Sequence, residues 1–213
     1  MINWQEKLTT ENFYLNPVPH FRVYDLIDID IHNELYEEYQ SIISSKILLE
    51  DHRHGFTQGT SYMIWRPNKP QPLSPNMSSL LHSLTGAQDD VFDAYNRLAK
   101  CNLSPTFDST DSVNFNFWHR HAFIPGELVY DYHRDGEDLK FVSIYYLGMG
   151  DEESGDIEIK NEETQEEISY EYTANSYILF LNEHPQKHRF RHPSNGRDRR
   201  TLNTAFPAKH LTN

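Results

Sequence analysis

The sequence contains a single cysteine, Cys101, so an intramolecular disulfide is excluded. Chains of this kind are typical of reducing compartments. The N-terminal segment lacks a basic region followed by an apolar run, and no later stretch approaches the length of a membrane-spanning helix. We therefore expect a cytoplasmic protein without membrane association.

Positive charge is also scarce, because 19 Lys and Arg residues stand against 32 Asp and Glu residues, a formal net charge of −13. Such a surface repels phosphate backbones, so nucleic acid is an unexpected partner. The basic cluster near the C-terminus is interpreted as a solvated loop with one buried anchor. Glycine is infrequent, with 9 residues, while aromatic residues reach 13%, and this composition favours a packed globule over disorder.

A chain of 213 residues suits one domain with a full core. We expect a single domain over 1–213, with helical support and loops in 1–110 and a jelly-roll core in 111–207. Residues 1–19 are expected to be an extended lead-in. Apolar spacing near 3.6 predicts helices over 28–43 and in two pieces of 76–103. Alternation predicts strands over 21–27, 112–123, 130–147, 156–160, 171–181 and 199–206.

Mostly consecutive strands with helices gathered in the first half fit a mainly β fold with flanking helices, an antiparallel double-sheet jelly roll. The pattern alone leaves a sandwich and a barrel undecided.

A possible metal site begins at His133 and Asp135, which are two residues apart and would project side by side from an extended chain. His188, which we expect in a loop that follows an apolar strand, could supply a third ligand. His184 is the alternative distal ligand, but it immediately precedes Pro185 and should lie in a turn. Two imidazoles and one carboxylate leave three positions of an octahedral ion open, as is typical of non-haem Fe(II) oxygenases. Two other His pairs are interpreted as loop, edge or supporting residues: His52 and His54, and His119 and His121.

A strand pattern from Arg199 to Phe206 divides its side chains between two faces. One face carries Arg199, Thr201, Asn203 and Ala205, and the other carries Arg200, Leu202, Thr204 and Phe206. The first face suits a polar pocket and the second suits packing, so Arg199 is preferred over Arg200 as a pocket residue, with Asn203 beside it. A guanidinium holds a carboxylate through two parallel hydrogen bonds and could anchor a dicarboxylic co-substrate.

In this order, His133-x-Asp135, His188 and Arg199 resemble the 2-oxoglutarate and Fe(II)-dependent dioxygenases, particularly the prolyl-hydroxylase-like branch. The resemblance covers roughly Asn114 to Phe206 and includes the run from Phe141 to Leu147. It implies a double-stranded β-helix fold, and it assigns to Tyr146 a hydrogen bond to the 2-oxoglutarate carboxylate. One departure is Ile124-Pro125-Gly126, where many relatives have Tyr-Pro-Gly, so a contact made by that tyrosine is missing or supplied elsewhere.

The resemblance further implies Fe(II), 2-oxoglutarate and O₂ as cofactor and co-substrates, with release of succinate and CO₂. Halogenating relatives lack the carboxylate that Asp135 provides, so hydroxylation is expected. The substrate class is a small molecule or a peptidyl residue, such as a free amino acid or a protein side chain, and the oligomeric state is open. Two alternatives are a non-enzymatic jelly-roll binding module and a cupin-like metal enzyme that does not use 2-oxoglutarate.

Overall fold

The computed structural model describes residues 2–44, 49–50, 60–62, 64–65, 73–106, 114–120, 131–149, 156–190 and 199–211. The side chains of residues 42–44, 49–50, 60–62, 64–65, 114–120 and 199 lie outside this description. All structural statements below concern the described part of the chain.

The larger of two sheets is antiparallel and is organised around β13 (Arg199–His210), which pairs with β8 (Lys140–Tyr146) on one side and β7 (Asn114–Arg120) on the other. The strand order is β1-β2-β11-β8-β13-β7-β4-β3. Two further strands lie off this path, because β5 pairs with β7 and β6 pairs with β13. The remaining strands span Phe13–Tyr14 (β1), His20–Val23 (β2), Leu49–Glu50 (β3), Thr60–Tyr62 (β4), Ile64–Trp65 (β5), Leu103–Pro105 (β6) and Ser176–Leu181 (β11).

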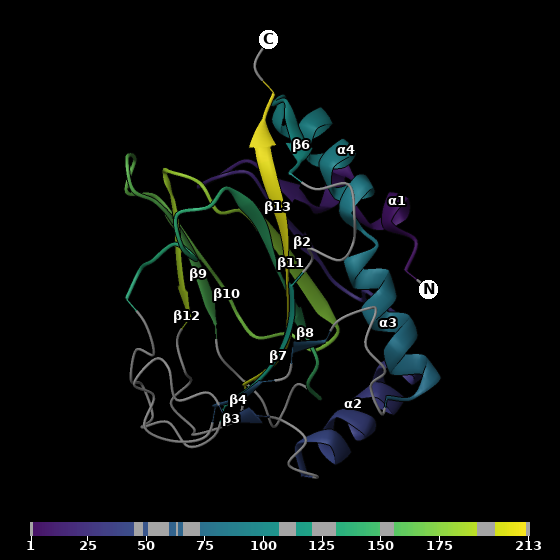
Figure 1. The fold of residues 1–213 in the computed structure, drawn as a ribbon. Coiled ribbons are helices and arrows are strands. Elements are labelled where there is room, and N and C mark those ends of the chain that lie inside the picture. Colours follow the sequence, from purple (N-terminus) through teal and green to yellow (C-terminus); the bar gives the residue numbers. More distant parts are fainter. Residues whose placement is uncertain are drawn as a thin grey trace.

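The smaller sheet has the order β10-β9-β12, formed by Glu167–Tyr170 (β10), Ile157–Asn161 (β9) and Gln186–Phe190 (β12). It stands opposite the larger sheet (Figure 1). Between the sheets lies an apolar cluster of buried side chains from both layers: Val18, Val142, Ile144, Tyr146, Ile157, Ile159, Ile178 and Phe180. Successive side chains of a β-strand point to opposite faces, so every second side chain of β8 and of β11 enters this interior.

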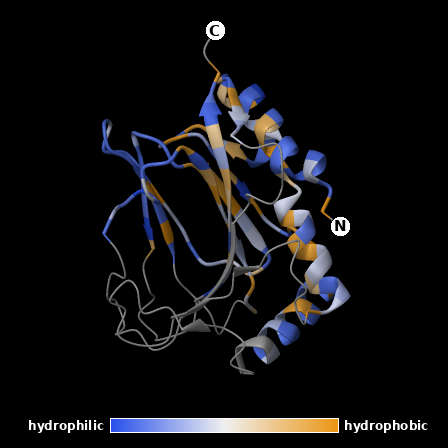
Figure 2. Ribbon diagram, in the orientation of Figure 1, coloured by the Kyte–Doolittle hydropathy of each residue, from blue (hydrophilic) through white to orange (hydrophobic). Residues whose placement is uncertain are grey.

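Helices cover the opposite, outer face of the larger sheet (Figure 1). They are α2 (Ile29–Ser44), α3 (Pro75–Thr85) and α4 (Gln88–Ala99). Ser74 caps the N-terminus of α3, because its hydroxyl accepts a hydrogen bond from the Met77 amide, and Pro75 is the first residue of the helix. Apolar residues of the helices pack against outward-facing residues of the sheet, including Phe141, Tyr145, Leu202 and Phe206. Apolar segments accordingly lie along the strands and on the helices (Figure 2).

The predicted fold class is confirmed: a mainly antiparallel jelly roll with flanking helices. The helices expected over 28–43 and 76–103 are present as α2, α3 and α4. The expectation of an extended lead-in was wrong, because α1 (Trp4–Lys7) and a 3₁₀ turn over Thr10–Asn12 form there. Trp4 is buried, and its Nε1 donates to the Ser83 carbonyl at 2.9 Å, so tertiary packing stabilises a short helix that lacks helical periodicity. Among the described residues, no helix combines the length and apolar character needed to cross a bilayer.

Two buried histidines tie separate parts of the fold together. From α2, His32 contacts the Tyr145 hydroxyl through Nδ1 at 2.6 Å and the Gly148 carbonyl through Nε2 at 2.7 Å. In β2, His20 joins the Val18 carbonyl to the Tyr170 hydroxyl of the other sheet, at 2.7 and 2.6 Å. Burial lowers the pKa of both imidazoles below 6.5, although their bonds to backbone carbonyls oppose that shift.

We expect the fold to lose stability as the pH falls below about 6.5, because the unfolded chain then binds protons that these two buried imidazoles resist. The sign follows from the lowered folded-state pKa, and the loss levels off once the pH is below that value. The urea concentration at the unfolding midpoint should therefore decrease when the pH is lowered from 7.5 to 5. The variant His32→Gln should cost about 1–3 kcal/mol at neutral pH and show a shallower pH dependence. The control is the same substitution at exposed His82, and an unchanged slope in His32→Gln would contradict the prediction.

Candidate metal centre

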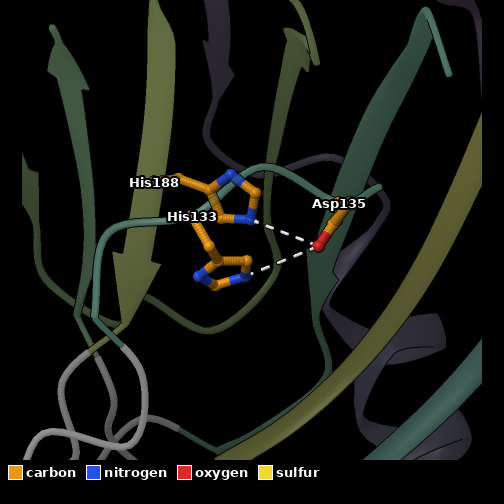
Figure 3. A group of neighbouring side chains, drawn as sticks. All are labelled: His133, Asp135 and His188. Atoms are coloured by element: carbon orange, nitrogen blue, oxygen red, sulfur yellow. Dashed lines mark ion pairs between the residues drawn. The ribbon is translucent and has the colours of Figure 1, made fainter. Parts of the chain in front are cut away.

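Three side chains predicted as metal ligands converge at one point of the fold. Nε2 of His133 lies 3.5 Å from Oδ1 of Asp135, and Nε2 of His188 lies 3.7 Å from the same oxygen. One potential ligand atom from each residue lies within 4.8 Å of the other two. Both imidazoles point toward the carboxylate (Figure 3). An ion seated among these atoms would be held from one side only, which leaves positions open for other ligands.

Backbone pairing sets the separation of the two imidazoles. The His133 amide donates to the His188 carbonyl at 2.9 Å, and the His188 amide donates to the His133 carbonyl at 3.0 Å. Residues that exchange both hydrogen bonds lie directly opposite each other, with their side chains on the same face. The two rings consequently lie 4.6 Å apart between centroids. His188 was expected in a loop, but it lies in β12, and this correction explains its fixed position.

Asp135 reaches the site from a turn and not from the extended strand that the His-x-Asp spacing suggested. The pairing with β12 ends at His133, and residues 135–138 form bends, with Gly136 at φ 78°. Buried Asn182 holds this turn, because its Oδ1 accepts from the Asp135 amide at 2.8 Å. Its Nδ2 also lies 3.3 Å from the Asp138 carbonyl. The carboxylate is thus placed by an amide that is distant in sequence.

Neighbouring polar groups orient the imidazoles. His133 Nδ1 donates to the Asp131 carbonyl at 2.9 Å, which leaves the Nε2 lone pair facing the site. The Gln186 amide lies 3.2 Å from His188 Nδ1 and is buried. The amide atom that faces His188 Nδ1 is Nε2 of Gln186. Rotation of the amide by 180° would bring its oxygen to that nitrogen, where it would accept Nδ1–H and leave His188 Nε2 for a metal. Phe180 packs against the His188 ring at 4.8 Å and forms an apolar wall.

The carboxylate is held in its ionised form. Burial raises the pKa of Asp135, but while the two imidazoles are protonated the hydrogen bond from His133 and the charges of His188, His133 and Lys140 outweigh that effect, so the net pKa is lowered. An ionised carboxylate beside two imidazoles is the donor set that Fe(II) and similar divalent ions accept. The residues present therefore fit such an ion.

The outer face of the small sheet carries a polar cluster directly behind the ligands. Arg189, next to His188, pairs through Nε with Glu158 and stacks over the Tyr132 ring at 4.1 Å. Tyr132, next to His133, has its hydroxyl 3.0 Å from a carboxylate oxygen of each of Glu158 and Glu167 and donates to one at a time. The segments that carry His133 and His188, already joined by backbone hydrogen bonds, are thus also joined through side chains on the face of the sheet opposite the site.

The interior beyond the metal ligands is lined by β8 and β13. Tyr146 is fully buried there, with its ring against Tyr172 at 4.9 Å. Thr201 lies opposite Tyr146 and Asn203 lies opposite Ile144 in the β13–β8 register, so both face the interior. The Oδ1 atom of Asn203 is buried and has no hydrogen-bond partner among the described residues.

The alternatives to Arg199 and His188, which are Arg200 and His184, lie away from the three metal ligands. Arg200 faces α2, where Nη1 donates to the Tyr36 hydroxyl at 2.7 Å, and the Gln40 amide oxygen can accept from the same nitrogen. His184 is exposed and lies 3.7 Å from Glu163, away from the cluster of ligands. The Arg199 side chain lies outside the described part of the structure. So do His52, His54, His121, the His119 side chain and Ile124-Pro125-Gly126.

Sequence reasoning missed Asn182, Gln186 and Asp131. Asn182 and Gln186 flank the turn before β12, and Asp131 acts through its backbone carbonyl. Only Gln186 carried a signal, since it lies two residues before His188 and shares its strand face.

Comparison with solved structures finds prolyl hydroxylases among the chains of similar fold. A prolyl 4-hydroxylase from Pseudomonas putida has a TM-score of 0.60 at 18% identity, covering 88% of this chain and 91% of that chain. A prolyl hydroxylase from Trichoplax adhaerens, in complex with a hypoxia inducible factor peptide fragment, has a TM-score of 0.62 at 10% identity, covering 88% and 83%. The chain has the fold of the prolyl hydroxylases. No family model and no curated protein matches the sequence.

An epimerase also resembles this chain in fold. The epimerase SnoN, solved with Fe³⁺, alpha ketoglutarate and nogalamycin RO, has a TM-score of 0.57 at 10% identity, covering 90% of this chain and 81% of that chain. At such identities the likeness establishes the fold.

We expect the purified chain to bind one Mn(II) or Fe(II) through these three side chains. The variant Asp135→Ala should reduce affinity by far more than the 10–100-fold typical of a supporting residue, because a direct ligand is lost. Titration followed by electron paramagnetic resonance of Mn(II) measures this. His184→Ala is the matched control and should bind like the wild type. Equal binding by Asp135→Ala would contradict the assignment.

The outer cluster should stabilise the centre. Glu158→Gln leaves the mostly buried Arg189 cation without its carboxylate, and we expect a loss of about 3 kcal/mol in unfolding free energy. Metal affinity should fall about tenfold as the two ligand segments loosen. The matched control is Glu162→Gln, which removes a more exposed ion pair with Lys187, a residue of β12 like Arg189. Equal effects of the two variants on stability and metal affinity would show that the cluster has no special role.

Proposed function

We propose that the chain is an Fe(II)- and 2-oxoglutarate-dependent dioxygenase that hydroxylates a small molecule or a peptidyl residue. The observation that carries this proposal is the convergence of His133, Asp135 and His188 within a prolyl-hydroxylase fold. A non-enzymatic jelly roll has no need for two oriented imidazoles and an ionised carboxylate at one point.

These three side chains would hold the iron. When bound, Fe(II) would supply the activation of O₂ that is coupled to oxidation of 2-oxoglutarate to succinate and CO₂. The chain's own contribution is positional. The Asp131 carbonyl and Gln186 fix the ring orientation of the two histidines, Asn182 fixes the turn that carries Asp135, and Phe180 keeps one side of the site dry.

The co-substrate would enter the interior along β8 and β13. The period-two alternation of a strand predicts that Arg199, two positions before Thr201 in β13, extends to the same face as Thr201 and opposite to Arg200. In this proposal Arg199 anchors the distal carboxylate and Tyr146 hydrogen-bonds it. Asn203 supports this placement, since a buried amide with an unsatisfied atom is a common sign of a polar ligand, and the amide can turn to donate Nδ2–H.

The substrate class rests on the comparisons and on charge. One structural neighbour was solved with a peptide fragment and another with nogalamycin RO. Both substrate types are therefore compatible with this fold. The net charge of −13 favours a neutral or basic substrate over an acidic one.

We expect the Fe(II)-loaded protein to convert 2-oxoglutarate to succinate slowly in the absence of a prime substrate. Arg199→Ala should raise the KM for 2-oxoglutarate by about 30-fold or more, because a buried charge pair is lost. The control is Arg200→Met, which removes a buried guanidinium that contacts α2. Succinate is measured by chromatography. A normal KM in Arg199→Ala, or no 2-oxoglutarate binding by wild type, would overturn the proposal.

A further inference from the structure

A cation lies in the interior of the barrel, on a strand outside the region of the sequence resemblance. Arg22 belongs to β2 and stands opposite Ile178 of β11, whose side chain belongs to the apolar cluster between the sheets. Directly paired residues share a face, so Arg22 also enters the interior. Its side chain is among the largest that are fully buried, and the residue is 1% exposed.

The surroundings of Arg22 only partly satisfy its guanidinium. The carbon Cζ lies 5.3 Å from the centre of the Tyr146 ring, 4.9 Å from that of Tyr24 and 5.4 Å from that of Tyr170. Nη2 donates to the Glu171 carbonyl at 3.3 Å. Among the described residues, Nε and Nη1 are buried and make no hydrogen bond.

Burying the Arg22 guanidinium with unsatisfied donors is unfavourable in free energy. Removing a guanidinium from water costs several kcal/mol, and each aromatic face returns about 0.5–2 kcal/mol. Aromatic faces also leave N–H donors unsatisfied, and an unsatisfied buried donor costs more than its bond would have contributed. A carboxylate placed in the interior would accept those donors and neutralise the charge.

We propose that Arg22 is a second binding residue for the distal carboxylate of 2-oxoglutarate, on the Tyr146 side of the pocket. This inference rests on the proposed function. It follows from the contact between Arg22 and Tyr146, the residue proposed to hydrogen-bond that carboxylate, and from the two donors that lack acceptors. With Arg199 on β13, the dianion would be held from two strands of the large sheet.

Binding of two 2-oxo acids to the Mn(II)-loaded protein, measured by calorimetry, tests this role. The 2-oxo acids are 2-oxoglutarate and 2-oxobutyrate, which offers the same chelating end without the distal carboxylate. Arg22→Met keeps much of the side-chain volume and removes the charge. It should weaken 2-oxoglutarate binding at least tenfold and leave 2-oxobutyrate binding unchanged. The control is Arg200→Met, which removes another buried guanidinium, from the other face of the sheet, and should alter the binding of neither acid.

Each outcome has one meaning. Unchanged 2-oxoglutarate binding in Arg22→Met, or equal weakening of both acids, overturns the inference and leaves Arg22 a packing residue. If Arg22→Met does not fold, Arg22→Lys decides, since it keeps the charge but loses the forked donors. Selective weakening of 2-oxoglutarate binding then supports the role, and its absence overturns it. If wild type binds neither acid, the proposed function itself fails, which is a different result.

Discussion

The reciprocal pair of backbone hydrogen bonds between His133 and His188 is the constraint on which the candidate site depends. It brings together two segments that are far apart in the sequence, and it fixes both imidazoles on one face of the small sheet. The adjacent residues, Tyr132 and Arg189, must then lie on the other face, where they stack and share Glu158. One pairing therefore produces both the ligand geometry and the outer cluster that stabilises it.

Strand alternation divides neighbouring residues between two functions in the large sheet. Tyr145 faces the helices and bonds to His32, while Tyr146 faces the interior. Arg200 likewise faces Tyr36 of α2, while Thr201 and Asn203 face the interior. A shift of one residue in register would exchange every such pair, so the packing of the helices on Phe141, Leu202 and Phe206 also specifies which side chains line the pocket.

Much of this arrangement could be predicted from the sequence because it follows from periodicity. The period-two pattern in 199–206 separated Arg200 from Asn203 correctly, and spacing near 3.6 located α2, α3 and α4. The parts that were wrong or missed depend on contacts distant in sequence. Asp135 lies in a turn because the Asn182 side chain holds it, and α1 forms because Trp4 is buried. No local pattern encodes such contacts. The individual roles of His133, Asp135, His188, Arg199, Tyr146 and Asn203 stay predictions.

The negative net charge of the chain bears on how its interior could bind a dianion. A formal net charge of −13 creates a field that opposes the approach of a dianion, so affinity for 2-oxoglutarate has to arise from groups inside the barrel. A divalent ion at Asp135, His133 and His188 would neutralise one end of that molecule. Arg199, the first residue of β13, would alone meet the other end with a single charge. Buried Arg22, which faces Tyr146 and has two unsatisfied donors, adds a cation where low polarity makes each charge count most. An acidic exterior and a cationic interior are thus compatible. Contacts with buried groups would determine the affinity for the dianion, whereas the surface charge affects mainly the rate of association.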